Sequence, residues 1–495
     1  MSSESYSART VGWTLGAALA LLGLPTLYVA LSSWHWPLMH DAPLMHYIAW
    51  RLADGATAYR DLFDMNLPGA YFIHSLLYAA FGAADLPWRL FDLAWLALTA
   101  TLLALYCRPF GGWAAALATL LFCSFHLAKG PGSVGQRDFL ILPFILLALL
   151  SLNRFLRTTE WRCAALAGLA LGASLTIKPQ LALLFAFFAA AMIVRLWKTP
   201  GTWLRAAALL GVTGIVFPAA MFFWLWRTDA LAPFLDIMRH YLLPFYSQLS
   251  SASLGKQVES FIRQTWVFYL PLPLLPLAYN RRELLNGPLF LPLVGLAFGT
   301  INYFVQNKNF NYHLYPCALF LTICCAAALT RILTAERAKQ AAVLAAVLLL
   351  AWLQGLQTWQ SRVLMASLEE SQRRIQRELQ RDIQRLHRPG GTVQVMDTTS
   401  GGIEALLRLK IRQPSRFIYD FHFYHDTQDP RIQRLRAELL AALREHPPQL
   451  IALCQDTWLN FGYERLERFP ELRDWLSQNY RLETEGFGYR LYVQP

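Results

Sequence analysis

The chain is dominated by apolar stretches of about the length that crosses a lipid bilayer. Eleven such stretches lie before residue 361, at 11–32, 87–107, 110–127, 138–155, 161–177, 180–197, 203–226, 262–280, 287–305, 313–333 and 340–360. A helix needs about 20 apolar residues to cross the hydrocarbon core. Only 15% of the residues are charged, against roughly a quarter in soluble proteins. The sequence therefore excludes a purely soluble protein and predicts a polytopic, all-α membrane bundle of about eleven transmembrane helices.

The density of charge changes abruptly near residue 361. The first 361 residues hold 38 charged side chains, and the last 134 residues hold another 38. We therefore expect a transmembrane domain at 1–361 and a soluble domain at 362–495. Strand-like segments at 392–397, 416–421, 449–454 and 489–493 alternate with helical ones in the second part, which predicts a small α/β domain. It has no phosphate-binding loop, zinc spacing or nucleophile elbow, so we expect an accessory domain.

Basic residues in the loops predict the orientation of the spans. The short connections on the side of the N-terminus carry thirteen lysines and arginines, the last two being Arg337 and Lys339. Loops rich in basic residues stay in the cytoplasm. We therefore expect the loops 34–86, 128–137, 178–179, 227–261 and 306–312, and the domain at 362–495, on the periplasmic side of a bacterial inner membrane. This assignment needs the 15-residue apolar segment 68–82 to be re-entrant or interfacial, because a twelfth span would invert everything after it.

Charge and cysteine content exclude two other classes of protein. The net charge of +12 resides mostly in the membrane part, and the polar tail has no basic stripe with interleaved aromatic residues, so we expect no nucleic-acid partner. The seven cysteines show no C-x-x-C spacing, which excludes a disulfide framework or a cysteine zinc site. The oligomeric state is left open.

Ionisable residues gather at the predicted outer ends of the spans, where a functional site is expected because a charge in hydrocarbon costs about 3 kcal/mol. Asp41 either caps the start of an amphipathic helix at 43–53 or acts as a general base. Lys178 and Lys308 either extend along apolar surface to reach water or bind an anion. Arg89 and Asp92, three residues apart, either form a structural ion pair or belong to the site. The remaining candidates are Lys129, Arg137, Asp138, Tyr312 and His313.

Three motifs resemble those of a known family. The first loop reads HDAPLMHYIAWRLADG, followed by YRDLFDMNLPGAYF; GQRDFLILPF spans 135–144, and FVQNKNFNYHLYP spans 304–316. Together they resemble the GT-C glycosyltransferase superfamily, in the branch of protein O-mannosyltransferases and the lipid A aminoarabinose transferase. The resemblance covers the whole membrane part, and the polar tail is similar to the outer-face domain of such enzymes.

The resemblance implies an inverting transfer from a polyprenyl-phosphate sugar. Asp41 matches the family's base, and Asp138 matches its second acidic residue, which orients the acceptor or holds a divalent cation. Lys308, Tyr312, His313, Lys178 and Arg137 are then the candidates for binding the donor phosphate. No cofactor is certain beyond the lipid-linked donor substrate. Protein O-mannosyltransferases place a Glu after the first Asp, whereas Ala42 follows Asp41 here, which favours a lipid, lipopolysaccharide or cell-wall glycan acceptor over a protein.

The sequence thus favours a membrane glycosyltransferase whose catalytic first periplasmic loop is 34–86. Two alternatives stay open. An O-antigen ligase or polymerase would need a large loop rich in Arg and His between late spans, and 306–312 is short. A non-enzymatic flippase for lipid-linked sugars would need charges deep inside the bundle or an internal repeat.

Overall fold

The computed structural model describes residues 3–249, 251–269, 271–335, 340–456, 458 and 462–495. Arg337 and Lys339, used above to orient the spans, lie outside the described residues. The chain forms two compact units, each described by itself below. Unit 1 comprises Met1–His35, Arg89–Ala220 and Ser251–Met365, and unit 2 comprises Trp36–Trp88, Met221–Ser250 and Ala366–Pro495.

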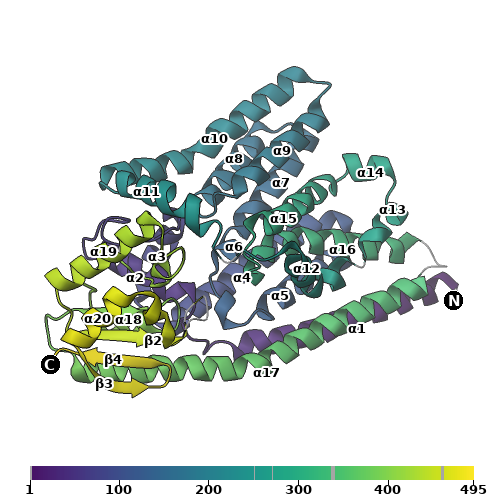
Figure 1. The fold of residues 1–495 in the computed structure, drawn as a ribbon. Helices are drawn as coiled ribbons and strands as arrows, with labels where there is room; N and C mark the ends of the chain where they lie inside the picture. The colour runs from purple at the N-terminus through teal and green to yellow at the C-terminus, as the bar shows by residue number, and fades with distance from the viewer. Residues whose placement is uncertain (1–2, 250, 270, 336–339, 457, 459–461) are drawn as a thin grey trace. The chain divides into compact units, whose positions relative to one another are not determined.

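Unit 1 is a bundle of apolar helices (Figure 1). Its helices are α1 (Ser3–Ser32), α4 (Asp85–Cys107), α5 (Gly112–Leu127), α6 (Arg137–Leu140), α7 (Leu142–Thr158), α8 (Trp161–Leu175), α9 (Leu181–Leu196), α10 (Pro200–Arg227), α12 (Leu254–Tyr269), α13 (Leu275–Ala278), α14 (Arg281–Asn286), α15 (Phe290–Gln306), α16 (Tyr315–Ala335) and the first half of α17 (Gln340–Leu386). Its 3-10 turns are η1 (Arg108–Phe110), η2 (Pro131–Ser133), η4 (Leu272–Leu274) and η5 (Asn311–Leu314). The most apolar window of Asn311–Leu333 is 94% buried, so α16 is the central helix of this unit.

Ten of the eleven predicted spans correspond to single apolar helices or to the continuous pair α6 and α7. Among the described residues, six helices are long and apolar enough to cross a membrane, and four shorter apolar helices have 10–17 residues. The predicted span at 262–280 is wrong, because α12 ends at Tyr269 and only η4 and α13 follow it. Pro271, Pro273 and Pro276 interrupt this stretch, and proline removes a helical hydrogen bond and clashes with the preceding turn.

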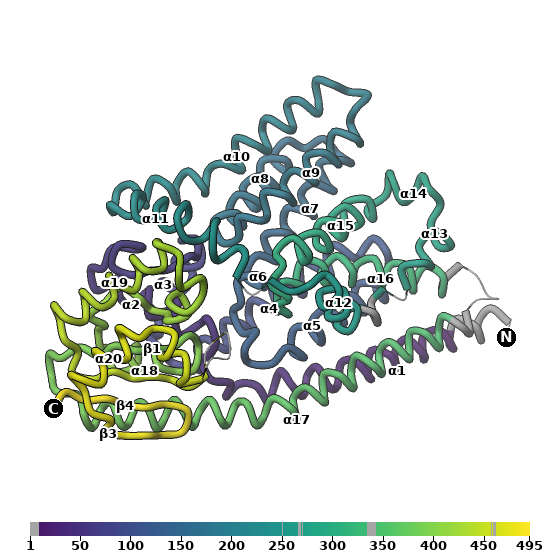
Figure 2. The backbone as a smooth tube through the Cα atoms, viewed as in Figure 1, coloured from purple at the N-terminus to yellow at the C-terminus, as the bar shows by residue number. Residues whose placement is uncertain are grey.

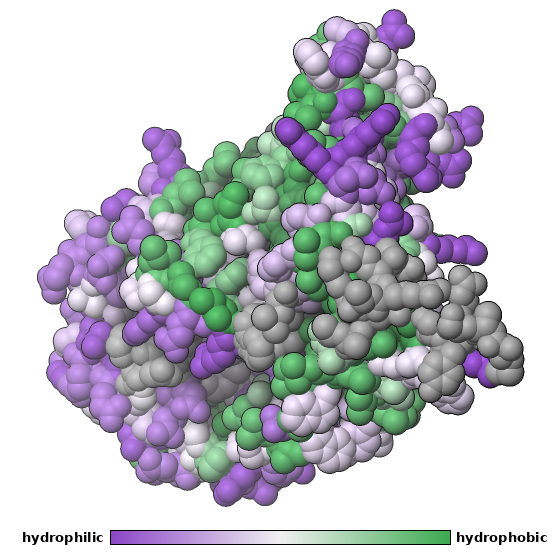
Figure 3. Space-filling view, turned by 90° about the vertical axis from the view of Figure 1, so that its right-hand side faces the viewer, coloured by the Kyte–Doolittle hydropathy of each residue, from purple (hydrophilic) through white to green (hydrophobic). Residues whose placement is uncertain are grey.

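The surface of unit 1 carries large apolar side chains, as a bundle in lipid requires. Leu24, Val212 and Val305 are each more than two-thirds exposed, and Figure 3 shows broad hydrophobic areas in green on one face of the molecule. Helix α1 and the first half of α17 lie side by side (Figure 2), with the rings of Tyr28 and Trp359 5.1 Å apart. The fold is therefore that of a multi-pass membrane protein.

Unit 2 combines the first loop with the C-terminal part. It contains α2 (Asp41–Ala53), α3 (Pro68–Phe81), the last turns of α10, α11 (Leu231–Ile237), a π-helix η3 (Met238–Tyr246), the second half of α17, α18 (Gly402–Leu409), η7 (Phe421–Phe423), α19 (Pro430–Glu445), η8 (Tyr463–Arg468) and α20 (Pro470–Asn479). Helix α3 has 14 residues, too few to span a bilayer; its re-entrant or interfacial placement stays a prediction. Because α17 runs unbroken through residue 361, the boundary expected there coincides with no helix end.

A small mixed sheet organises the C-terminal part of unit 2. Its strands are β1 (Val393–Met396), β2 (Leu450–Cys454), β3 (Arg481–Gly486) and β4 (Tyr489–Val493), in the order β1-β2-β4-β3. Strands β1 and β2 are parallel, with Val393 opposite Leu450, and β4 runs antiparallel to both of its neighbours. The second half of α17 runs along the β3–β4 hairpin (Figure 1), where the Tyr489 hydroxyl donates to Asp382 Oδ2 at 2.6 Å.

The strand predicted at 416–421 is wrong, and the strand β3 was not predicted. Phe417 makes only an isolated bridge, to Phe63 of the first loop, and Phe63 N donates to the Arg416 carbonyl at 2.7 Å. This segment therefore binds the first loop to the C-terminal part within unit 2. Strand β3 is rich in charged residues and mostly exposed at the sheet edge, so it lacks the apolar alternation that marks a half-buried strand.

Candidate active site

The connection between α15 and α16 carries three of the predicted site residues, Lys308, Tyr312 and His313. The two helices approach closely at Gly299, where an added Cβ would lie 2.6 Å from the Cys317 Cα. The connection then turns through Asn309, whose φ of 55° lies in the left-handed region that asparagine tolerates better than most residues. Because the hydroxyl of Tyr303 on α15 donates to Asn309 Oδ1 at 2.7 Å, the start of α16 is fixed against the end of α15.

A second segment, at the start of α6 and α7, brings Asp138 to the same unit. Asp138 Oδ2 lies 2.7 Å from Lys178 Nζ, and only 2% of the aspartate side chain and 11% of the lysine side chain are exposed. Lys178 belongs to the connection between α8 and α9. A buried pair of this kind costs desolvation for both charges. The sequence named both residues, but it did not predict that they bind each other.

The remaining predicted residues of unit 1 gather around this ion pair. Lys178 Nζ lies 5.9 Å from the ring centre of Tyr312. The ring of His313 is 4% exposed, and the positive charges of Lys178, Arg137 and Lys308 all act on it. We call Arg137, Lys178 and Lys308 the cation cluster. Three positive side chains act on His313, and only one of them, Lys178, is paired with the Asp138 carboxylate, so this region has a positive electrostatic potential that attracts an anion.

Lys308 is the member of the cation cluster whose charge depends most on its surroundings. It is 8% exposed, and burial lowers the pKa of its ammonium group to about 8, because the charged form loses its hydration. An anion bound beside it would raise this pKa again. Above neutral pH, Lys308 can therefore take up a proton when it binds an anionic group.

Lys129, another predicted outer residue, contacts the same connection indirectly. Its Nζ donates to Gln264 Oε1 at 2.8 Å, and Gln264 Nε2 donates to Asn311 Oδ1 at 2.8 Å. Burial lowers the pKa of Lys129 to about 7. The ammonium also lies 4.6 Å from the ring centre of Phe125, so it is a partly charged donor beside the 311–314 turn.

Asp41 belongs to unit 2. It is the first residue of α2 and follows the N-cap, His40, whose ring nitrogen Nδ1 lies 3.2 Å from Asp41 Oδ1. Asp41 is therefore not the N-cap of this helix, and the structural alternative considered for it loses support. Helix α2 itself is predicted correctly, but Ala42 to Ala49 are buried, because α3 and α18 pack against it. The catalytic role of Asp41 stays a prediction.

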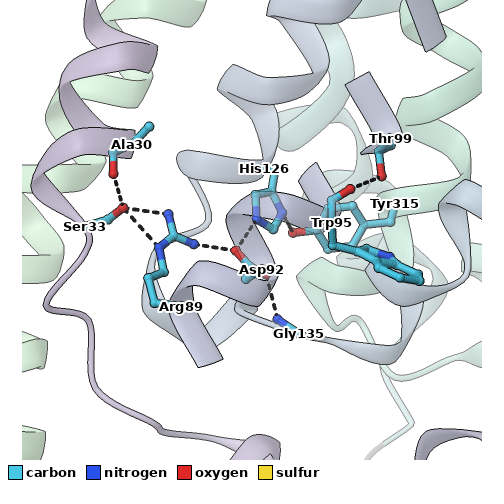
Figure 4. Close-up of polar contacts among 9 residues, drawn as sticks. All are labelled: Ala30, Ser33, Arg89, Asp92, Trp95, Thr99, His126, Gly135 and Tyr315. Carbon is cyan, nitrogen blue, oxygen red and sulfur yellow. Dashed lines mark hydrogen bonds and ion pairs between the residues drawn. The ribbon is translucent and has the colours of Figure 1, made fainter. Parts of the chain in front are cut away.

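Arg89 and Asp92 form the ion pair that their spacing predicts, and the pair is part of a larger network (Figure 4). The Arg89 guanidinium also donates to Ser33 Oγ, and Asp92 Oδ1 accepts from the Gly135 backbone N–H at 2.8 Å. Asp92 Oδ2 also lies 3.1 Å from His126 Nε2. Every member lies in unit 1.

His126 and Tyr315 are the residues of this network that sequence reasoning missed. His126 Nδ1 lies 2.7 Å from the Tyr315 hydroxyl, and both side chains are almost completely buried. The search for a site in the sequence rested on charged residues at the ends of the spans, and neither of these residues is formally charged. A histidine as the penultimate residue of an apolar helix is the signal that could have identified the site.

The donor set around Asp138 does not fit a divalent cation. A magnesium or manganese site takes several oxygen ligands, usually carboxylates, whereas the closest charged partner of Asp138 is a lysine, with two further positive side chains nearby. Within the described ranges, no group of three or more His, Cys, Asp and Glu side chains could hold a metal ion. His46 and His74, whose Nδ1 atoms lie 2.9 Å apart, are a pair and not such a group.

Comparison with known proteins shows what this chain is similar to. A family model described as dolichyl-phosphate-mannose-protein mannosyltransferase matches residues 66–225, which include Asp138 and Lys178. The crystal structure of ArnT from Cupriavidus metallidurans in the apo state aligns over 98% of each chain, with a TM-score of 0.66 and 13% identity. The chain therefore shares the fold of ArnT, and its residues 66–225 are similar to the mannosyltransferase family.

A second solved structure shows the same fold. The structure of the same ArnT bound to undecaprenyl phosphate aligns over 94% of this chain and 97% of that chain, with a TM-score of 0.65 and 13% identity. The search of curated protein sequences found no match. At this identity the solved structures establish the fold of the chain, and its function has to be argued from its own residues.

Proposed function

We propose that this protein is an inverting GT-C glycosyltransferase that takes a sugar from a polyprenyl-phosphate sugar. The observation that carries the proposal is the cation cluster of Arg137, Lys178 and Lys308, whose charges all act on His313 and of which Lys178 pairs with Asp138. A concentration of positive charge in a poorly exposed site suits the negative charge of a lipid phosphate. The fold adds support, because one similar solved structure is ArnT bound to undecaprenyl phosphate.

The chemistry assigns a role to each group. The acceptor hydroxyl or amine attacks the anomeric carbon from the face opposite the phosphate, a new bond to the sugar forms, and the bond from the sugar to the phosphate breaks. Asp41 takes the proton of the acceptor as general base. Lys178, Lys308 and Arg137 stabilise the negative charge that the departing phosphate gains, and Tyr312 and His313 line this position. Asp138 holds Lys178 and orients the acceptor.

The acceptor is proposed to be a lipid, lipopolysaccharide or cell-wall glycan. Ala42 stands where protein O-mannosyltransferases carry a glutamate, which weakens the case for a protein acceptor. The orientation follows from the basic loops: the catalytic first loop at 34–86 and the domain at 362–495 face the periplasm of the inner membrane. In this proposal 1–361 carry out the transfer, and 362–495 form an accessory domain.

Binding of the carrier lipid tests the proposal most simply. The full-length protein in lipid nanodiscs is titrated with undecaprenyl phosphate, and the wild type is expected to show saturable binding. Lys178→Met and Lys308→Ala should each weaken the affinity about tenfold or more, because each removes one partly buried charge from the phosphate. Lys198→Ala, at an exposed lysine of the same unit, is the matched control and should change nothing.

Transfer is then tested with a panel of undecaprenyl-phosphate sugars, by measuring the release of undecaprenyl phosphate in the presence of envelope lipids. Absence of saturable binding, or equal weakening by the Lys198→Ala control, would refute the phosphate site. Saturable binding without transfer from any donor in the panel would instead favour a flippase.

A further inference from the structure

The buried network around Asp92 contacts two of the segments that carry the candidate site. Asp92 Oδ1 accepts a hydrogen bond from the Gly135 N–H at 2.8 Å, and Trp95 Nε1 donates to the Leu140 carbonyl at 3.2 Å. The two side chains lie three residues apart on α4, so they project from the same face of the helix. Together they hold both ends of the segment 135–140, which carries Arg137 and Asp138; Figure 4 shows the contact at Gly135.

The same network reaches the second segment through a chain of three side chains. The Asp92 carboxylate can only accept hydrogen bonds, so His126 carries a proton on Nε2. His126 Nδ1 is hydrogen-bonded to the Tyr315 hydroxyl, 2.7 Å away. Tyr315 is the first residue of α16 and follows η5 directly, so this hydrogen bond fixes the turn that carries Tyr312 and His313.

Packing reinforces both connections. The imidazole of His126 stacks on the ring of Phe139, with centroids 4.0 Å apart and an interplanar angle of 24°, and Phe139 follows Asp138 in the chain. Arg89 neutralises the carboxylate of Asp92 and is itself bound by Ser33 Oγ. Fully bonded polar networks in a low-dielectric interior hold their members rigidly.

We propose that Asp92, Trp95, His126 and Tyr315 are positioning residues, which hold Asp138 and the 312–313 turn in the register that lets Lys178 bind the donor phosphate. This inference rests on the proposed function, because it assigns the network to that site. None of the four residues is proposed to touch the substrate. Their effect on binding passes through the position of these two segments beside Lys178.

The test removes one hydrogen bond at a time. Tyr315→Phe deletes the hydroxyl that bonds to His126 and keeps the ring, whereas Trp95→Phe deletes the N–H that donates to Leu140 and keeps a smaller aromatic ring. Tyr106→Phe is the matched control, since Tyr106 is a buried tyrosine of the same unit whose hydroxyl donates to the Pro288 carbonyl at 2.5 Å. Undecaprenyl phosphate is the probe, and its affinity and the ³¹P chemical shift of its bound form are measured on the full-length protein.

Tyr315→Phe and Trp95→Phe should each weaken the affinity about fivefold and move the bound ³¹P signal, and Tyr106→Phe should do neither. In a Lys178→Met background, Tyr315→Phe should change the affinity less than about twofold, because residues that act through one another are not additive. Wild-type affinity and an unmoved signal in both phenylalanine variants, or full additivity with Lys178→Met, would overturn the inference. If the wild type does not bind undecaprenyl phosphate, or Lys178→Met binds as the wild type does, the proposed function fails instead.

Discussion

Replacing Asp138 by asparagine should make the protein bind undecaprenyl phosphate more tightly. The substitution keeps the size of the side chain and removes the carboxylate that pairs with Lys178 of the cation cluster. Asp138 lies 2.7 Å from Lys178 Nζ, so a phosphate on the other side of that ammonium would lie about 5 Å from the carboxylate. At this distance, with an effective dielectric constant of about 20, two unit charges repel each other by about 3 kcal/mol.

Part of this gain is lost to solvent screening, because the Lys178 side chain is 11% exposed, and to the cost of removing a counter-charge from the cations before the lipid binds. We therefore expect the affinity to rise about tenfold, which corresponds to about 1.4 kcal/mol. Turnover should nevertheless fall, because the phosphate product leaves more slowly and the acceptor loses its orienting carboxylate.

The assay is a titration of the protein in nanodiscs with undecaprenyl phosphate, with and without a chelator. Glu160→Gln is the matched control, since it removes a carboxylate of the same unit that is exposed and pairs with Arg154 at 2.9 Å. An affinity for Asp138→Asn that is unchanged or weaker would refute the electrostatic reasoning. If Asp138→Asn binds undecaprenyl phosphate more weakly, and the chelator weakens binding by the wild type in the same way, then Asp138 binds the phosphate through a divalent cation.

Three further predictions address other parts of the molecule. Because the pKa of Lys308 is about 8, its positive charge is present below that pH and lost above it, so the affinity for undecaprenyl phosphate should fall between pH about 7 and about 9. Lys308→Arg should abolish this fall. Asp41→Asn should reduce turnover by about a hundredfold or more and change the affinity for undecaprenyl phosphate by less than about twofold. Normal turnover in this variant would show that Asp41 is not the base. Arg465→Met should destabilise the C-terminal sheet by about 3 kcal/mol or more, because Arg465 Nε binds the buried Asp420 carboxylate at 2.7 Å; faster hydrogen exchange in β1 checks this, with the exposed Arg473→Met as control.

The sequence predicted the helices of the bundle well because one property, apolar character over about 20 residues, decides them. The prediction failed where a property other than apolar character decides the structure. The stretch at 262–280 is apolar enough to span, yet Pro271, Pro273 and Pro276 interrupt it. The segment 416–421 has the composition of a strand, but Phe417 pairs with Phe63, a partner more than 350 residues away that local pattern cannot identify.

The candidate site was likewise predicted only in part. Charged side chains at the ends of apolar spans are visible in a sequence because their cost in lipid is high, and this rule found Asp138, Lys178 and Lys308. The rule gave no information about which of these residues bind each other, since 40 residues separate Asp138 from Lys178. It also overlooked His126 and Tyr315, whose importance comes from the hydrogen bonds they make and not from a formal charge.

The position of the phosphate group tests the central claim most directly. We predict that an experimental structure of the full-length protein with undecaprenyl phosphate will place the phosphate oxygens within hydrogen-bonding distance of Lys178 and Lys308, beside Tyr312 and His313. A lipid phosphate bound elsewhere in the protein, with the ion pair of Asp138 and Lys178 unchanged and no anion at the cation cluster, would contradict the account.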